Sequence, residues 1–249
     1  RQTRSLHSMK RARMNRRDHM GPLILRGAIV AALATGLLLG ERLLPYFTSQ
    51  SSIIALAYVV TTLVVMIQRR TSPPPAPRLR GAVTFWLLTT ALISHILNNR
   101  GESPLPGLVV ADPALAIDNW GLFLLHYVAP GLVLLDWALF GPHGIVRWRD
   151  TLLWLLYPIG YGVVMIARGA LLPEINVRYP YPFLDPTLNG VDGMLLALLR
   201  VVVMLAVISL AVVALDRLSG FVSRRLTAPS IDPAAPPSTA SAPSEVTDH

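Results

Sequence analysis

The sequence contains no cysteine and almost no lysine. The lack of cysteine excludes disulfides, zinc–cysteine sites, iron–sulfur clusters and a cysteine nucleophile. Lys10 is the single lysine, so arginine carries nearly all the positive charge. Charged residues make up only 14% of the 249 residues and hydrophobic residues 53%, whereas a soluble domain usually has about 25% charged residues. So few charges cannot cover a water-exposed surface, and the composition predicts an integral membrane protein.

Six apolar runs are long enough, with their polar flanks, to cross a bilayer as helices of about 17–25 residues. Alternation with a period of two is absent, which argues against a membrane β-barrel. We expect an all-α polytopic protein with a basic tail (1–21), a transmembrane domain (22–218) and a disordered tail rich in Pro, Ala and Ser (219–249). The expected spans are 22–44, 50–68, 79–98, 118–140, 151–172 and 191–215.

A cleavable signal peptide is the rival interpretation of the first apolar run, because a basic segment precedes it. The run is long, however, and no clear A-x-A cleavage site follows it. An uncleaved first span is therefore the favoured interpretation.

The arginines alternate along the chain in the way that orients membrane helices. Beyond the basic N-terminal tail, alternate connections and the C-terminal flank are rich in arginine, at Arg69, Arg70, Arg78, Arg80, Arg147, Arg149, Arg217, Arg224 and Arg225. The other connections hold one arginine each, at Arg42, Arg100 and Arg178. Both termini are therefore expected in the cytoplasm. The abundance of Ala, Pro, Val and Arg suggests a bacterial source and its cell membrane. Topology accounts for the net charge of +8, and no nucleic-acid partner is expected.

Polar residues within spans are the first candidates for function, because they are costly in hydrocarbon. His126 lies inside the fourth span and Arg200 inside the sixth, and Arg168 lies near the outer end of the fifth. Other polar groups are expected at the same outer level, at Thr48, His95, Asn98, Asn99, Asp118, Asn119, Tyr179, Tyr181 and Asp185. We expect these groups to line a polar chamber that opens outward.

Each polar residue also has a structural interpretation. Arg168 can extend to the interface, and the tyrosines can belong to the aromatic belt. Arg200 can pair with Asp118 or Asp185. Asp136, near the inner end of the fourth span, is expected to pair with an arginine of the loop that follows it.

The pairing of Thr48 with His126 would support acyl-transfer chemistry. A hydroxyl becomes a nucleophile when a base removes its proton, and histidine is the usual base. The two side chains would meet if the second and fourth spans are neighbours. The remaining roles would fall to Asp118 or Asp185, which would orient the imidazole, and to Asn98, Asn99 or Asn119, which would donate to an oxyanion. No local G-x-S-x-G motif is present.

Other functional classes, namely haem proteins, zinc proteins and transporters, have less support in the sequence. A haem site needs paired axial ligands, and only His95 and His126 are candidates. Zinc needs three or four close ligands, and a transporter would commonly show repeats and broken helices. We therefore expect no metal and no cofactor. A non-catalytic membrane protein, with a lipid-binding, scaffold or transport role and a structural polar cluster, is the alternative to an enzyme.

Five segments carry a family resemblance, in order along the chain: Pro45–Ile53, Ile117–Trp120, Leu125–Trp137, Trp148–Asp150 and Tyr179–Asp185. They resemble the bacterial relatives of the androgen-induced membrane proteins, a family that includes the androgen-dependent TFPI-regulating protein. The most specific parts are the Tyr-Pro-Phe-Leu loop and the spacing from His126 to Asp136.

The resemblance implies a six-span hydrolase in contact with membrane lipids. The animal members cleave fatty acid esters of hydroxy fatty acids with a threonine nucleophile and a histidine. Thr48 takes the position of the nucleophile and His126 that of the histidine, which implies a fatty acyl ester as substrate. One departure is that the proline after the histidine falls one residue earlier here, at Pro130.

Overall fold

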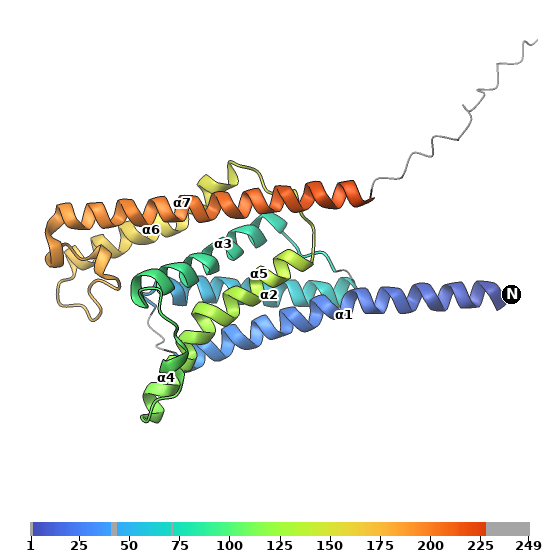
Figure 1. Ribbon diagram of the computed structural model, residues 1–249, viewed down its shortest axis with the longest axis horizontal. Helices are drawn as coiled ribbons and strands as arrows, with labels where there is room; N and C mark the ends of the chain where they lie inside the picture. The colour runs from blue at the N-terminus through green and yellow to red at the C-terminus, as the bar shows by residue number, and fades with distance from the viewer. Residues whose placement is uncertain (1, 41–43, 71, 228–249) are drawn as a thin grey trace, which may run out of the picture.

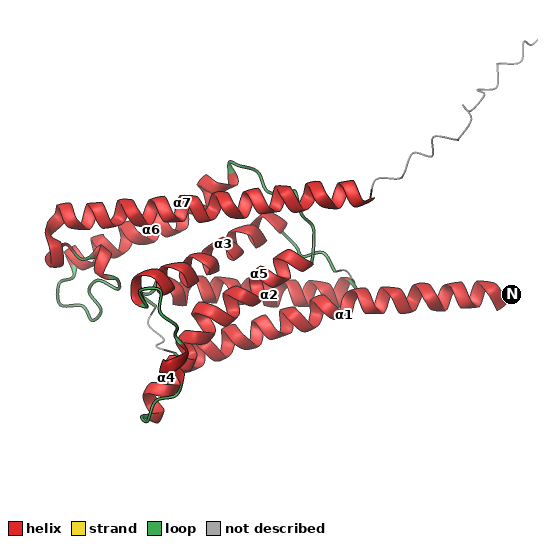
Figure 2. Ribbon diagram, viewed as in Figure 1, coloured by secondary structure: helices red, strands yellow, loops and turns green. Residues whose placement is uncertain are grey.

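The computed structural model describes residues 2–40, 44–70 and 72–227. Within these ranges the chain is helical apart from its connections, and no strand occurs (Figure 2). Six helices are long and apolar enough to cross a membrane, at Met20–Leu39, Phe47–Arg69, Pro77–Leu97, Pro113–Leu139, Asp150–Leu171 and Pro186–Arg225. The expected all-α polytopic architecture with six spans is confirmed.

The helical elements follow one another as α1 (Gln2–Leu39), α2 (Phe47–Arg69), α3 (Pro77–Ile93), η1 (Ser94–Asn98), η2 (Leu105–Leu108), α4 (Pro113–Phe123), η3 (Leu124–Val128), α5 (Ala129–Leu139), α6 (Asp150–Leu171), η4 (Pro182–Leu184) and α7 (Pro186–Thr227). The elements η1 and η3 are π-helical turns, and η2 and η4 are 3₁₀ turns. The third span therefore joins α3 to η1, and the fourth joins α4, η3 and α5.

Some boundaries differ from the sequence-based expectation. The first helix begins at Gln2, so the basic segment is helical and continuous with the first span. The last helix continues to Thr227, so residues 219–227 are helical instead of disordered, and 228–249 lie outside the described residues. The fourth span begins early, at Pro113, because the Asp112 carboxylate accepts hydrogen bonds from the first-turn amides and caps α4.

The third span lies at the centre of the bundle (Figure 1). It contacts α2 and α5 on one side and α6 and α7 on the other. Its side chains Phe85 and Leu87 are fully buried. Because α6 and α7 pack on each other and on α3, α3 connects this pair to the rest of the bundle.

The two ends of the bundle differ (Figure 1). One end carries the connections between α1 and α2, between η1 and α4, and between α6 and α7; we refer to it as the loop end. The opposite end carries the start of α1, the two remaining connections and the end of α7; we refer to it as the terminal end.

A backbone contact fixes α4 against α1 near the loop end. A Cβ atom at Gly121 would overlap the backbone of Gly40, so only glycine allows the two helices to come this close. Small residues permit such approaches between membrane helices. The contact lies five residues before His126 and therefore helps to set the position of that side chain.

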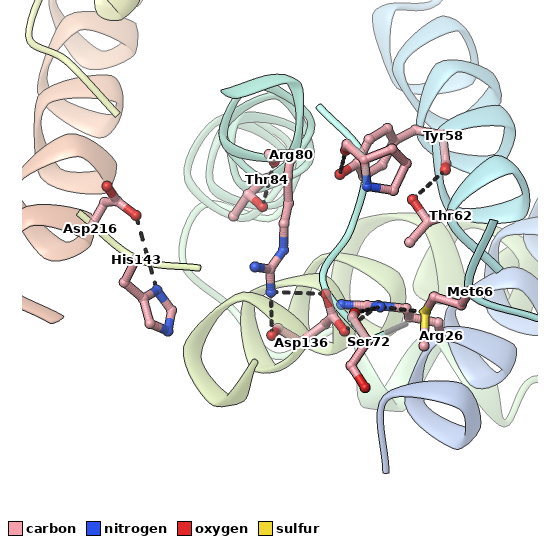
Figure 3. Close-up of polar contacts among 11 residues, drawn as sticks. Arg26, Tyr58, Thr62, Met66, Ser72, Arg80, Thr84, Asp136, His143 and Asp216 are labelled. Atoms are coloured by element: carbon pink, nitrogen blue, oxygen red, sulfur yellow. Dashed lines mark hydrogen bonds and ion pairs between the residues drawn. The ribbon is translucent and has the colours of Figure 1, made fainter. Parts of the chain in front are cut away.

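A buried ion cluster joins three spans nearer the terminal end (Figure 3). Arg26 of α1 donates from Nε to Oδ1 of Asp136 at 2.9 Å, and Arg80 of α3 donates from Nη2 to Oδ2 at 3.1 Å. Arg80 also donates to the main-chain carbonyl of Asp136 at 2.5 Å. All three residues are buried. The expected partner was an arginine of the following loop, Arg147 or Arg149. The carboxylate instead faces the bundle interior, where two neighbouring spans supply the guanidinium groups.

A second contact attaches the connection after α5 to α7. The Asp216 carboxylate accepts a hydrogen bond from the Val146 amide at 3.0 Å and lies 4.0 Å from Nδ1 of His143. Burial lowers the pKa of His143 below its ordinary value, and the nearby Arg80 guanidinium lowers it further, although Asp216 raises it. The imidazole is therefore neutral at neutral pH.

Replacing Asp136 by alanine leaves two buried guanidinium groups without their carboxylate. We expect the free energy of unfolding to fall by about 3–5 kcal/mol, as it does when one partner of a buried ion pair is removed. Thermal unfolding in detergent measures the change. Asp192→Ala, at an exposed position of α7, is the matched control and should unfold like the unmodified protein. Equal melting temperatures for the two variants would contradict a stabilising role of the cluster.

Candidate functional site

Thr48 and His126 meet at the loop end of the bundle. Thr48 lies in the first turn of α2, and His126 lies in the π-helical turn η3. The Thr48 hydroxyl oxygen is 3.1 Å from Nε2 of His126, so the expected contact between the second and fourth spans is present. Thr48 is 8% exposed and His126 is half-buried. The hydroxyl is thus shielded from bulk water while the ring remains partly accessible.

A main-chain contact defines the tautomer of His126. Nδ1 of the ring lies 2.9 Å from the carbonyl oxygen of Leu122. A carbonyl only accepts hydrogen bonds, so Nδ1 must carry the proton. In the neutral ring Nε2 is then unprotonated and accepts the hydrogen bond from the Thr48 hydroxyl. A general base needs this arrangement toward a nucleophile.

Two π-helical turns lie at this level of the bundle. One contains His126, and the other, η1, contains Ser94 and His95. Such turns widen a helix by one residue and often occur at functional sites. Pro130 is the sequence signal for the first, because it has no N–H to donate to the carbonyl four residues earlier and interrupts the regular ladder. Neither turn was expected from the sequence.

The first-turn amides of α2 lie beside the Thr48 hydroxyl, and those of Phe47 and Thr48 form hydrogen bonds with the Tyr181 phenol. The N-cap residue Tyr46 makes no side-chain cap, and the first backbone bond of the helix runs from the Gln50 amide to the Tyr46 carbonyl at 3.2 Å. The amides of Phe47, Thr48 and Ser49 have no carbonyl partner within the helix. This end of α2 carries a partial positive charge, which favours a negatively charged group beside it.

The Tyr-Pro-Tyr-Pro loop covers the start of α2. The Tyr181 ring meets Tyr46 edge-on with ring centroids 5.7 Å apart, and it stacks on Phe183 at 5.1 Å. Burial raises the pKa of the Tyr181 phenol above its ordinary value, and the neighbouring Thr48 and Phe47 offset part of that change. The phenol is therefore protonated at neutral pH, and its oxygen lies within hydrogen-bond reach of the Thr48 hydroxyl and of the Thr48 and Phe47 amides.

An apolar chamber of about 200 Å³ lies on one side of the Thr48–His126 pair. Its walls come from α3, α6 and α7 and include Ile93, Ile159, Val163, Val201 and Val202. Most of the side chains that line it are hydrocarbon, so its surface is predominantly apolar.

A polar chamber of about 880 Å³ lies on the other side. Asn99, Arg100, Glu102, Asn119 and Tyr127 are among the residues that line it. Arg100 and Glu102 are exposed, so this chamber opens to solvent at the loop end. Four residues line both chambers: Thr48, Ser94, His126 and Tyr181. The candidate pair therefore lies in the wall between an apolar and a polar space.

The predicted asparagines are engaged in other hydrogen bonds. Asn99 donates to the Tyr127 hydroxyl at 2.7 Å, and Asn119 donates to the Gly107 carbonyl at 2.7 Å. The side chain of Asn98 lies outside the described residues. The positive end of α2 and the Tyr181 phenol both lie beside Thr48 and are therefore better placed than these asparagines to stabilise a negative charge there. His95 contacts the same Tyr127 hydroxyl, through Nδ1 at 3.2 Å.

The expected aspartates are not at the histidine. Asp118 lines neither chamber, and Asp185 accepts hydrogen bonds from the amide and hydroxyl of Thr187, which lies in the first turn of α7. The Leu122 carbonyl orients His126 in their place. The aspartates were predicted from their depth alone, and depth does not define the direction in which a side chain points.

Three further residues expected at the site, Arg168, Tyr179 and Arg200, make their contacts away from Thr48 and His126. Arg168 donates to loop carbonyls of residues 176–178 and holds that loop against α6. Tyr179 packs against Gly169, where a Cβ atom would overlap its ring. Arg200 is exposed on α7, because the face that includes Val201 and Val202 is the one that lines the apolar chamber.

Comparisons of the chain with protein-family models, with curated proteins and with solved structures give no match.

The His126 tautomer can be measured directly. We expect ¹⁵N NMR of histidine-labelled protein in detergent to show a neutral ring protonated at Nδ1, because the Leu122 carbonyl requires a donor. His126→Gln assigns the signal among the six histidines of the chain. Thr48→Val should shift the Nε2 resonance by removing its hydrogen-bond donor. An Nε2-protonated ring would contradict the orientation of the pair.

Proposed function

We propose that the protein is an integral membrane lipid-ester hydrolase with Thr48 as nucleophile and His126 as general base. The supporting observation is the 3.1 Å contact between the Thr48 hydroxyl and the unprotonated nitrogen of His126. The Leu122 carbonyl holds the ring in the tautomer that the chemistry needs. The family resemblance in the sequence points to the same two residues.

The first half of the reaction forms an acyl-threonine. His126 Nε2 takes the proton of the Thr48 hydroxyl as its oxygen attacks the acyl carbonyl carbon. The tetrahedral intermediate then expels the alcohol oxygen, which receives the proton from His126. In the second half, His126 takes a proton from water, the hydroxide attacks the acyl carbon, and the proton returns to Thr48 as the fatty acid leaves.

The oxyanion of each intermediate needs donors that are already in place. The Thr48 hydroxyl lies in the first turn of α2, and the partial positive charge of this helix end favours the anion. The Tyr181 phenol lines both chambers beside Thr48, and its O–H would be available to donate to the oxyanion. We propose that these groups together bind the oxyanion.

The arginine distribution supports an orientation for the site. Arg69, Arg70, Arg147 and Arg149 lie at the terminal end, which we propose to be cytoplasmic. The loop end then faces the outside of the cell membrane, and the substrate reaches Thr48 from the outer leaflet.

A fluorophosphonate probe tests the nucleophile, because the activated hydroxyl displaces fluoride and becomes covalently labelled. We expect labelling of the purified protein, no labelling of Thr48→Ala, and a loss of at least about a hundredfold in the labelling rate of His126→Gln. Thr89→Ala is the matched control, since it removes a buried hydroxyl that lines the apolar chamber but forms no hydrogen bond with any described residue. Undiminished labelling of a folded Thr48→Ala variant would rule out the proposed nucleophile. A folded unmodified protein that is never labelled would favour a non-catalytic lipid-binding role.

Tyr161 provides a matched control for the phenol of Tyr181, because both rings pack against the start of α2. Tyr181→Phe should lower kcat for ester hydrolysis by about 10²–10³-fold with little change in KM, as removal of an oxyanion donor does. The Tyr161 hydroxyl donates to the Pro45 carbonyl at 2.5 Å, so Tyr161→Phe removes a hydroxyl from the same region without removing a donor to the oxyanion. We expect a much smaller effect on kcat for Tyr161→Phe. Equal effects of the two substitutions would assign Tyr181 a structural role only.

A further inference from the structure

We infer that the two chambers form a divided site for single-chain acyl esters of polar alcohols, with the acyl chain in the apolar chamber and the alcohol in the polar one. The inference rests on the proposed function and adds the substrate class. Its basis is that Thr48, His126 and Tyr181 line both spaces, so a carbonyl carbon held at Thr48 has one substituent on each side of the wall.

The apolar chamber opens sideways, between α6 and α7. Ile159 and Val163 of α6 and Val202 of α7 line it and are also 41%, 62% and 37% exposed on the flank of the bundle. All three lie within spans, where an exposed side chain faces lipid. An acyl chain can therefore pass between lipid and chamber without crossing water.

The apolar chamber follows α7 from Leu198 to Leu205, which at 1.5 Å per residue is a depth of about 10 Å. Apart from the four residues shared with the polar chamber, its hydroxyl groups are those of Thr89, Thr90 and Tyr161, and the rest of its lining is hydrocarbon. Since apolar surface gains free energy when it leaves water, this space selects the hydrocarbon part of a ligand.

The polar chamber selects the opposite chemistry. Its lining includes a guanidinium, a carboxylate and the amides of Asn99 and Asn119. A second hydrocarbon chain placed there would remove Arg100 and Glu102 from water and give them no hydrogen-bond partner in return, which is costly for charged groups. A hydroxylated alcohol such as glycerol can replace the lost water contacts. Water for the second half of the reaction reaches Thr48 through the same space.

The division into an apolar and a polar chamber predicts which of two esters is the better substrate. We expect kcat/KM for 1-palmitoylglycerol to exceed that for palmityl palmitate by at least about tenfold, the equivalent of ~1.4 kcal/mol. The two esters share the acyl chain and differ in the alcohol. Equal values would overturn the assignment of the polar chamber.

A bulky substitution that narrows the apolar chamber tests whether this chamber binds the acyl chain. Val202→Trp should lower the ratio of kcat/KM for 1-palmitoylglycerol to that for 1-butyrylglycerol by about tenfold or more, because only the long chain fills the chamber. Val203→Trp is the matched control, since Val203 is 55% exposed on the next position of α7 and does not line the chamber. A ratio that is unchanged in Val202→Trp, or that falls equally in both variants, would overturn the assignment.

A non-hydrolysable lipid separates the two proposals. The ether 1-O-hexadecylglycerol should raise the melting temperature of the full-length protein, of Thr48→Ala and of Val203→Trp, but not that of Val202→Trp. No stabilisation of the unmodified protein would overturn the divided site, whatever the enzyme does. Stabilisation that depends on Val202, together with no Thr48-dependent hydrolysis of any ester, would retain the lipid site and overturn the proposed hydrolase.

Discussion

A carboxylate inside a membrane bundle needs partners, and Asp136 finds two, in Arg26 and Arg80. These residues come from three different spans, so a single group ties α1, α3 and α5 together. The same spans reach the loop end, where α5 is continuous with the π turn that carries His126. The backbone contact between α1 and α4 fixes the fourth span a second time, near that turn. The position of His126 in front of α2 thus depends on an ion cluster at one end of the span and on a glycine crossing near the other.

A main-chain carbonyl orients His126, and an uncharged group of this kind suits the largely apolar environment of the ring. In a Ser-His-Asp triad a carboxylate orients the ring and also stabilises the imidazolium. A carboxylate in an apolar setting must itself be desolvated, and that cost can exceed its attraction to the ring. The Leu122 carbonyl fixes the same tautomer without adding a charge. In the proposed reaction, the partial positive end of α2 and the Tyr181 phenol would then stabilise the negative charge on the acyl oxygen.

Hydropathy predicts depth in a membrane but not rotation about a helix axis, and this separates what the sequence could predict from what it could not. The six spans followed from apolar runs, because backbone groups in lipid must form helices. The meeting of Thr48 and His126 followed from their common level and from the family resemblance. Arg200 shares that level but faces the outside of α7, and Asp136 points to other spans instead of the next loop. Packing decides such directions, and the π turn at His126, which Pro130 favours, also changes them locally.

The proposed hydrolysis of a lipid ester sets two requirements that conflict, because the acyl chain must leave water while the acyl-threonine must meet water. A single polar cavity would solvate the chain poorly, and a single apolar cavity would exclude the second reactant. The wall formed by Thr48, Ser94, His126 and Tyr181 separates the two environments and exposes the reacting groups to both. On the apolar side, low polarity strengthens the hydrogen bond between hydroxyl and imidazole. On the polar side, one face of the same pair stays open to water and to the departing alcohol. For the proposed enzyme, the Thr48–His126 pair therefore belongs at the boundary between the chambers, and six spans with loops at one end are enough to form that boundary.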